Sequence, residues 1–274
     1  MPNCISDPFL KVFMPIHSLY RDFFRFLSVY KKREDPFEAY QHYYLNPHKR
    51  FLTSYWKHFR YFDERQIENR VRSIKPGDYS LLQELLFHNS PEKICLETLK
   101  RCLEVKGFSE NKEPSQIPPE PHIYLFVGFF SADGFVLKLD DIFIMGFGLE
   151  RYKSFKSLPI IFTHEYGHYL QKLGIAKYKA KRDYREGTVG EFLLSEGLAF
   201  SFSIKVFPER KLFEHLFLSY QTCNWCIENE RRLMEKVRPF LDKPAEYNSI
   251  YFIEKERNIP SRSLNYVAYK LLER

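Results

Sequence analysis

The segment most informative about the fold is Ile160-Ile161-Phe162-Thr163-His164-Glu165-Tyr166-Gly167-His168-Tyr169-Leu170. It carries the pattern H-E-x-x-H inside an apolar segment, Leu158 to Leu173, for which we predict a buried helix. Residues four apart lie one above the other on a helix, so His164 and His168 can direct imidazole nitrogens at one tetrahedral zinc ion. Glu165 lies too far round the helix to be a third ligand. It can still reach a water on the metal, which makes it the candidate general base.

A second apolar segment downstream supplies the candidate third ligand. Val189 to Val206 reads as another buried helix, and Glu196 lies in its middle with Gly197 beside it. An ionised glutamate there would be costly to bury alone, and coordination of a metal compensates that cost. Glu191 is the alternative ligand, but it lies at the beginning of the helix, where a solvated residue is the simpler interpretation. Gly197 permits another helix to approach closely.

Three short segments rich in β-forming residues precede the motif. They are Ile123 to Phe130, Phe135 to Leu139 and Ile142 to Phe147, with Asp133-Gly134 and Asp140-Asp141 as the turns between them. This pattern predicts a small antiparallel sheet directly before the motif helix.

Helical spacing of apolar residues dominates the rest of the chain. From Pro8 to about Cys102 the spacing predicts several helices, and the apolar series at its beginning includes Ile16. Ser90 is the expected N-cap of a helix that begins at Pro91. Further along, Arg210 to Glu235 reads as one longer amphipathic helix.

A proline-rich and charged stretch from Asn111 to Pro121 cannot continue a helix and reads as a surface connector. It separates a helical N-terminal region, residues 1–110, from residues 120–274, which hold the sheet and the motif. We expect the two regions to form one functional unit. The order of helices, sheet and helices indicates an α+β fold.

Composition narrows the class of protein. A hydrophobic fraction of 44% and an aromatic fraction of 18% are those of an ordinary globular chain. The net charge of +7 is dispersed among acidic residues without a nucleic-acid-binding motif, so we expect no nucleic acid as a partner. We find neither a secretory signal nor an uncharged apolar run of membrane-spanning length, and the five cysteines are odd in number. These features predict a soluble, cytoplasmic protein with free thiols and no membrane association.

For three further patterns a structural interpretation is simpler than a functional one. Cys223-Asn224-Trp225-Cys226 has no second cysteine pair at zinc spacing, which indicates structural thiols on one helix. The basic segment Lys177 to Arg185 could rim a cleft for acidic substrates, but a solvated loop is the better interpretation. The remaining histidines stand singly without ligand spacing, and we expect most to be surface or core residues: His17, His42, His48, His58, His88, His122 and His215.

The pairing of HEYGH with the later SEGLA resembles the gluzincin class of zinc metallopeptidases, which combine two histidines with a downstream glutamate. Three stretches also resemble a bacterial family described only as predicted zinc-dependent proteases: Ile123 to Leu170, Glu196 to Phe200 and Arg262 to Lys270. That family tends to have glycines where this chain has Asn265 and Ala268. The resemblance implies a zincin-like fold, a zinc cofactor and hydrolysis of peptide bonds.

The resemblance further implies a donor that stabilises the oxyanion of the reaction intermediate. Tyr266 is the candidate and Tyr269 the second choice. Gluzincins often have an acidic residue one turn after the ligand glutamate to orient a histidine, but Phe200 stands there, so the orienting group must come from elsewhere. An edge strand could bind substrate backbone by strand addition, and Ile142 to Phe147 is the candidate by sequence position.

Two alternatives keep the ligand set His164, His168 and Glu196. One is a regulatory protease that acts on one specific protein, such as a repressor. The other is a non-catalytic, zinc-stabilised protein that binds a partner through the same cleft. Glu165 counts against the second, because a purely structural zinc site needs no base. A peptide or protein is the expected partner, and the sequence leaves its identity and the oligomeric state open.

Overall fold

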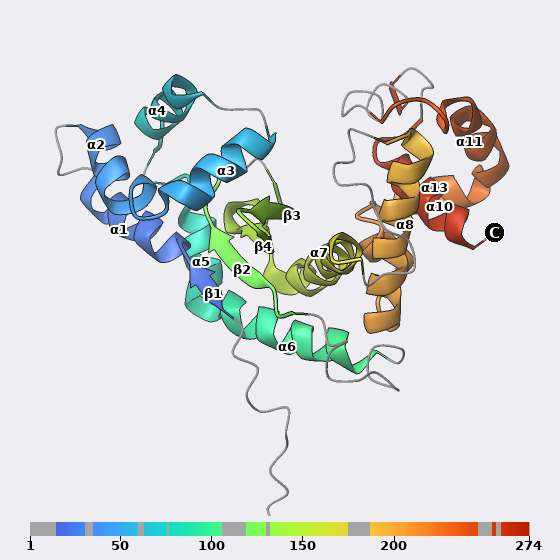
Figure 1. Cartoon of the computed structure of the whole chain (residues 1–274), viewed down its shortest axis with the longest axis horizontal. Coiled ribbons are helices and arrows are strands. Elements are labelled where there is room, and N and C mark those ends of the chain that lie inside the picture. The colour runs from blue at the N-terminus through green and yellow to red at the C-terminus, as the bar shows by residue number, and fades with distance from the viewer. Residues whose placement is uncertain are drawn as a thin grey trace, which may run out of the picture. The chain divides into compact units, whose positions relative to one another are not determined.

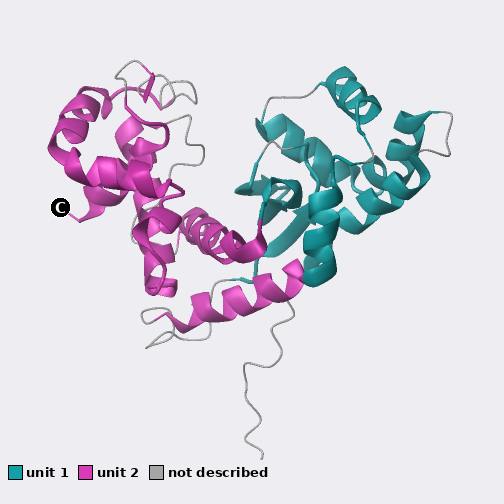
Figure 2. Ribbon diagram, turned by 180° about the vertical axis from the view of Figure 1, so that it is seen from behind, with its two compact units in different colours: residues 1–88, 118–153 teal, residues 89–117, 154–274 magenta. Residues whose placement is uncertain are grey.

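The computed structural model describes residues 15–30, 35–59, 63–75, 77–105, 119–129, 132–174, 187–245, 254–255 and 259–273 (Figure 1). Within these ranges the chain is mostly helical with one small sheet, which agrees with the α+β class predicted from the sequence. None of the helices described is both long and apolar enough to span a membrane. The chain divides into two compact units (Figure 2). The first comprises residues 1–88 and 118–153, and the second residues 89–117 and 154–274.

Four strands form the sheet of the first unit. They are β1 (Ile16–Ser18), β2 (His122–Phe126), β3 (Gly134–Leu139) and β4 (Ile142–Gly148), in the order β1-β2-β4-β3. β1 and β4 each pair with β2 in parallel, whereas β3 and β4 form an antiparallel hairpin. In the hairpin turn Asp140 has a φ of 54°, a left-handed conformation that two-residue hairpin turns favour.

Three predictions about this part of the chain are wrong. The sheet is mixed rather than antiparallel, because β4 lies beside β2 in parallel after the chain has passed through β3. The segment 142–147 is not an edge strand: β4 pairs with β2 on one side and β3 on the other, so its backbone is not free to add a peptide. Its unbroken burial from Ile144 to Gly148 is typical of an interior strand. Ile16 begins β1 and is not part of a helix.

The helices of the first unit lie between β1 and β2 in the chain. They are α1 (Tyr20–Tyr30), α2 (Pro36–Tyr40), α3 (Lys49–Phe59), α4 (Glu64–Arg72) and α5 (Ser80–His88), with a π-helical segment Gln41–Leu45 after α2 and a 3-10 turn Leu149–Arg151 after β4.

The core of the first unit is aromatic, and two tyrosine hydroxyls in it form hydrogen bonds with the backbone that follows β2. Tyr44 and Tyr55 are fully buried. The Tyr44 hydroxyl donates to the Val127 carbonyl at 2.9 Å and accepts from the Val127 amide at 3.0 Å. The Tyr55 hydroxyl donates to the Gly128 carbonyl at 3.2 Å. The backbone that follows β2 is therefore hydrogen-bonded although it has left the sheet.

The second unit is helical in the part that the structure describes. Its helices are α6 (Pro91–Glu104), α7 (Leu158–Lys172), α8 (Val189–Val206), α9 (Leu212–His215), α10 (Tyr220–Glu228), α11 (Glu230–Val237) and α13 (Ser263–Leu272), with 3-10 turns Phe155–Ser157 and Arg238–Phe240. α7 and α8 begin and end within one residue of the predicted bounds. Ser90 caps α6 as predicted, because its hydroxyl accepts from the Lys93 amide at 3.2 Å.

The single helix predicted for residues 210–235 is wrong, since α9, α10 and α11 divide that segment. Phe217 has a φ of 53°, which no right-handed helix can contain. Ser219 then caps α10 by accepting a hydrogen bond from the Thr222 amide at 3.0 Å. The connector predicted for residues 111–121 lies mainly outside the described residues.

Two glycines let α8 approach its neighbours α7 and α13 closely. A Cβ atom added at Gly197 would overlap the backbone carbonyl of Ala268 on α13. A Cβ atom added at Gly167 on α7 would lie 3.0 Å from the Ala199 Cα atom on α8, closer than ordinary van der Waals contact. The close helix approach predicted at Gly197 is thus confirmed, with α13 as the partner.

Candidate metal centre

Three side chains from α7 and α8 converge in the second unit. His164 Nε2 lies 3.3 Å from Glu196 Oε2, and His168 Nε2 lies 3.3 Å from Glu196 Oε1. The two Nε2 atoms are 3.1 Å apart. The three side chains can each direct one ligand atom so that these lie within 4.8 Å of one another, and the described residues contain no second group of this kind. The structure thus brings together the three residues predicted as ligands.

Polar contacts between α7 and α8 fix the helix crossing that brings together His164, His168 and Glu196, which we call the trio. Gln171 Nε2 donates to the Ser195 carbonyl at 3.0 Å, and Ser195 Oγ donates back to Gln171 Oε1 at 2.6 Å. At the other contact Thr163 Oγ1 lies 3.0 Å from Ser203 Oγ. Each of these residues is adjacent to a member of the trio or buried in the same crossing, so the relative position of the two helices is set by hydrogen bonds as well as by packing.

A buried histidine continues the second of these contacts. His215 Nδ1 lies 2.9 Å from Ser203 Oγ, and His215 Nε2 lies 3.1 Å from the Phe207 carbonyl. A carbonyl oxygen only accepts, so Nε2 carries the proton and Nδ1 accepts from the serine hydroxyl. Burial lowers the pKa of His215, which favours this neutral form. His215 is therefore a core residue, which is one of the two positions expected for the histidines outside the motif.

Aromatic packing surrounds the first histidine. His164 is 4% exposed, and its ring centroid lies 4.6 Å from that of Phe200 and 5.0 Å from that of Phe217. Its Nδ1 atom has no hydrogen-bond partner among the described residues. Phe200 occupies the position where an acidic residue would orient a histidine, and here the ring is oriented by contact with phenylalanines. Sequence reasoning expected another orienting group and did not find Phe217, which is 53 residues further along the chain than His164.

Charge interactions link the pKa values of the trio. Burial lowers the pKa of His164, and the neighbouring His168 lowers it further, although the hydrogen bond that His164 donates to Glu196 acts in the opposite direction. For His168 the attraction and hydrogen bond of Glu196 outweigh burial, and its pKa is raised. Burial by itself would raise the pKa of Glu196, but the two histidines hold it well below its usual range. Glu196 is therefore an anion that faces two imidazoles.

The two remaining glutamates considered from the sequence have distinct positions. Glu191 closes a capping box at the start of α8: the Thr188 amide donates to Glu191 Oε2 at 2.8 Å, and the Glu191 amide donates to Thr188 Oγ1 at 3.2 Å. This supports the choice of Glu196 over Glu191. Glu165 is half-buried, and its charge contributes to the raised pKa of His168, so its carboxylate lies near His168.

The tyrosines suggested as oxyanion donors lie on α13, and each donates a hydrogen bond to a carboxylate. The Tyr266 hydroxyl donates to Glu230 Oε2 on α11 at 2.8 Å, and burial followed by this carboxylate raises the pKa of Tyr266. The Tyr269 hydroxyl donates to Glu273. A catalytic role for either tyrosine stays a prediction.

The other patterns that the sequence discounted have structural positions where they are described. Cys223 and Cys226 are free, buried thiols on α10, and burial raises the pKa of each, which agrees with the structural interpretation. The basic segment 177–185 lies outside the described residues. Cys4 does too.

Two imidazole nitrogens and a carboxylate are among the usual ligands of zinc, and three protein ligands leave a fourth position for water or substrate. The donor set therefore fits a catalytic zinc ion. A family model described as "Predicted Zn-dependent protease (DUF2268)" matches residues 131–250 of the chain. The matched range contains HEYGH and Glu196 and ends before Tyr266. It confirms the resemblance to a family described as predicted zinc-dependent proteases. No curated protein and no solved structure matches the chain.

Proposed function

We propose that this chain is a zinc-dependent metallopeptidase of the gluzincin type with a zincin-like catalytic fold. His164, His168 and Glu196 would hold the zinc, Glu165 would be the general base, and a peptide or protein would be the substrate. The observation that carries the proposal is the convergence of two imidazole nitrogens and one carboxylate at the crossing of α7 and α8. The description of the matching family supports the same class of enzyme.

The chemistry divides between the metal and the chain. When bound, a zinc ion polarises the scissile carbonyl and lowers the pKa of a water molecule. The neutral His164 imidazole is able to present a nitrogen lone pair, because its pKa is lowered by burial. Glu165 takes the proton of the attacking water on its carboxylate and passes it to the leaving amine. Phe200 and Phe217 exclude water from the face of His164 that they cover, which strengthens the local charge interactions.

Tyr266 is kept in the proposal as the oxyanion donor, with a condition that follows from its contacts. Its hydroxyl donates to Glu230, so it would have to leave that carboxylate to donate to a developing oxyanion. Tyr266→Phe should then lower kcat more than it changes KM, because the interaction is made only in the transition state.

Metal content and cleavage of a peptide library, measured on wild type and three variants, test the proposal. We expect about one zinc per chain in the wild type and in Glu165→Gln, as three protein ligands would hold. Glu165→Gln should lose at least roughly 10²-fold in kcat, the usual contribution of a general base. Glu196→Gln should lose zinc. Glu191→Gln is the matched control on the same helix and should keep both zinc and activity.

Each of the other outcomes would indicate a different function or mechanism. Zinc in the wild type without cleavage of any library peptide or natural protein would favour a non-catalytic binding protein. Cleavage confined to one protein substrate would favour a regulatory protease. Wild type without zinc, or equal activity in Glu165→Gln, would overturn the proposed mechanism.

A further inference from the structure

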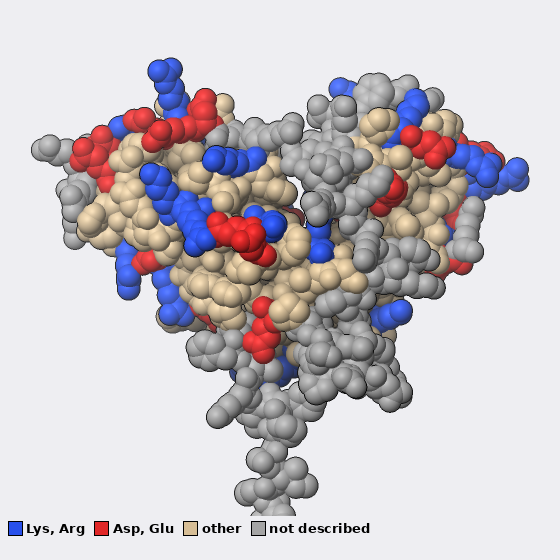
Figure 3. All heavy atoms as spheres, viewed as in Figure 1, with Lys and Arg blue, Asp and Glu red and all other residues tan. Residues whose placement is uncertain are grey.

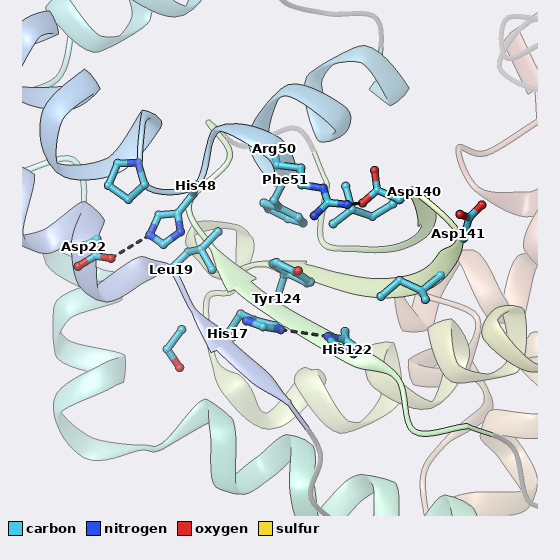
Figure 4. Close-up of a pocket in the computed structure, with 14 residues that line it drawn as sticks. His17, Leu19, Asp22, His48, Arg50, Phe51, His122, Tyr124, Asp140 and Asp141 are labelled. Carbon is cyan, nitrogen blue, oxygen red and sulfur yellow. Dashed lines mark hydrogen bonds and ion pairs between the residues drawn. The ribbon is translucent and has the colours of Figure 1, made fainter.

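The first unit holds a separate group of reactive side chains in an open cavity of about 760 Å³ (Figure 4). His17, His48 and His122 line it together with Tyr124. None of these residues belongs to the trio on α7 and α8. Their spacing in the sequence did not predict a group, since each histidine stands alone.

Strand pairing brings two of these histidines together. His17 on β1 is the direct partner of Tyr124 on β2, and His122 precedes Tyr124 by two residues on the same strand. Side chains two apart on a strand share a face, so the three rings lie on one side of the sheet. His17 Nε2 is 3.2 Å from His122 Nδ1, although the two residues are 105 apart in the sequence.

A row of stacked rings holds the imidazole pair in place. The ring centroids of Phe51 and Tyr124 are 4.3 Å apart with an interplanar angle of 4°, and those of Tyr124 and His17 are 4.4 Å apart at 20°. The rings of His17 and His122 are within 14° of parallel. Phe51 is buried in the core of the unit and anchors the row. The imidazoles of His17 and His122 themselves meet edge to edge, with ring centroids 5.5 Å apart, so a metal ion bound to both nitrogens would replace their hydrogen bond, and each ring would turn to point its lone pair at the ion.

The cavity has an acidic lining. Asp22, Asp140 and Asp141 line it, and Arg50 is the basic residue that lines it with them. Arg50 forms an ion pair with Asp140. Asp22 Oδ2 lies 2.8 Å from His48 Nε2 (Figure 4). The carboxylates outnumber the guanidinium, so the cavity favours a cation over an anion.

The imidazole nitrogens determine which class of cation the cavity would bind. An imidazole has an ordinary pKa of about 6.5, so most imidazoles are neutral at physiological pH and keep a lone pair on one ring nitrogen. Neutral imidazole binds Zn²⁺, Ni²⁺ and Cu²⁺ well, whereas Ca²⁺ and Mg²⁺ prefer oxygen ligands.

We propose that His17 and His122 form a second metal site, which takes a divalent transition-metal ion through His17 Nε2 and His122 Nδ1, with water as the remaining ligands. Two nitrogens bound to one tetrahedral ion at the usual length lie about 3.3 Å apart. The two atoms here are 3.2 Å apart. The proton that they share moves to the outer nitrogen of its own ring, so that both facing nitrogens become free to bind. No third His, Cys, Asp or Glu atom of the described residues completes a three-ligand group with them, so this site binds more weakly than the trio.

Calorimetric titration of the full chain with Ni²⁺, which avoids redox reactions with thiols, tests the site. We expect two ions per wild-type chain, and one per chain in His164→Gln/His168→Gln, where only the proposed second site remains. In that background, removing one of two linked ligands by His17→Gln or His122→Gln should weaken Ni²⁺ binding by roughly 10²-fold. Glutamine keeps a hydrogen-bonding side chain, so each variant is expected to fold, as far-UV circular dichroism would show.

His88→Gln is the control, because His88 is an exposed histidine on α5 that does not line the cavity. It should leave the second site unchanged. No binding of Ni²⁺ to the folded His164→Gln/His168→Gln protein would overturn the proposal. So would unchanged binding after either His17→Gln or His122→Gln. Neither result bears on the trio, because the experiment measures the second site in the absence of the first.

Discussion

Phe217 packs edge-on against His164, with ring centroids 5.0 Å apart at 74°, while its own backbone adopts a left-handed conformation with φ of 53°. Asn265 Nδ2 holds this turn by donating to the Leu216 carbonyl at 2.8 Å. A left-handed conformation costs a non-glycine residue about 1–2 kcal/mol. This unfavourable backbone conformation occurs at Phe217, whose ring covers His164. The Nδ1 atom of His164 has no hydrogen-bond partner in the described part of the chain. Packing thus orients His164 where a hydrogen bond usually would.

This relationship predicts that the two functions of Phe217 can be separated. Phe217→Ala and Phe217→Gly both remove the ring and should weaken zinc binding by roughly tenfold or more, the scale of losing a group that orients a ligand. Phe217→Gly also relieves the backbone strain, so it should exceed Phe217→Ala in free energy of unfolding by about 1 kcal/mol. Chelator competition measures the zinc affinity, and urea unfolding the stability.

Phe213→Ala is the matched control, because Phe213 packs against the same core cluster and, within the described residues, makes no ring contact with His164. It should leave zinc affinity near the wild-type value. Wild-type zinc affinity in Phe217→Ala would show that the aromatic contact does not orient the ligand.

The trio was predictable from the sequence because its geometry is mostly local. His164 and His168 are one helical turn apart, and the apolar segments that became α7 and α8 are long enough to fix their bounds. Glu196 was the carboxylate in the middle of the second apolar segment, whereas Glu191 lies at the start of that segment. The partners that orient the trio were not predictable, because Ser203, His215 and Phe217 acquire their roles only through tertiary packing.

The sheet and the second histidine pair depended on pairings that the sequence does not show. β1 has three residues, too few to give a strand pattern, and its partner β2 lies over 100 residues further along. Because the prediction paired neighbouring segments only, it missed both the parallel β2 and β4 pair and the meeting of His17 with His122. The break at Phe217 was also hidden, since the apolar spacing continues through it.

The contact between α8 and α13 makes a prediction about stability. Gly197→Ala places a Cβ atom on the backbone carbonyl of Ala268, which cannot rotate away, so α8 and α13 must separate. We expect a loss of about 1–3 kcal/mol or more in the free energy of unfolding, as overpacked cores show. Urea unfolding of the metal-free proteins would measure it.

Substitutions at two other glycines, where an added Cβ atom has more space, serve as comparisons for Gly197→Ala. Gly167→Ala should cost less, because its Cβ would lie 3.0 Å from the Ala199 Cα atom rather than overlap it. Gly77→Ala should be within about 0.5 kcal/mol of wild type, because a Cβ there meets no atom within 4 Å. Equal stability of all three variants would mean that the close approach at Gly197 is not maintained in solution.

His215 makes stability depend on pH in a known direction. Its pKa is lowered by burial in the folded state, so between that value and about 6.5 the unfolded state binds more protons. Its contribution to stability is therefore complete above about pH 6.5 and is lost as the pH falls towards the folded pKa. His215→Gln can still bond Ser203 and the Phe207 carbonyl but cannot titrate.

The measurement is the difference in free energy of unfolding between wild type and His215→Gln, in EDTA, from pH 5 to pH 8. Other titrating groups are common to both proteins and cancel in the difference. The wild type should lose more stability than the variant as the pH falls. A difference that stays constant with pH would show that His215 does not resist protonation.

Glu191 and Glu196 lie five residues apart on α8 and should respond to substitution in opposite ways. Glu191 serves the capping box with Thr188, so Glu191→Ala should lower the free energy of unfolding by about 0.5–2 kcal/mol and leave zinc affinity unchanged. Glu196 faces His164 and His168, so Glu196→Ala should weaken zinc binding by at least roughly 100-fold, more than losing an orienting group does. Measuring both quantities on both variants decides which carboxylate is the ligand. Loss of zinc in Glu191→Ala with zinc retained in Glu196→Ala would reverse the assignment.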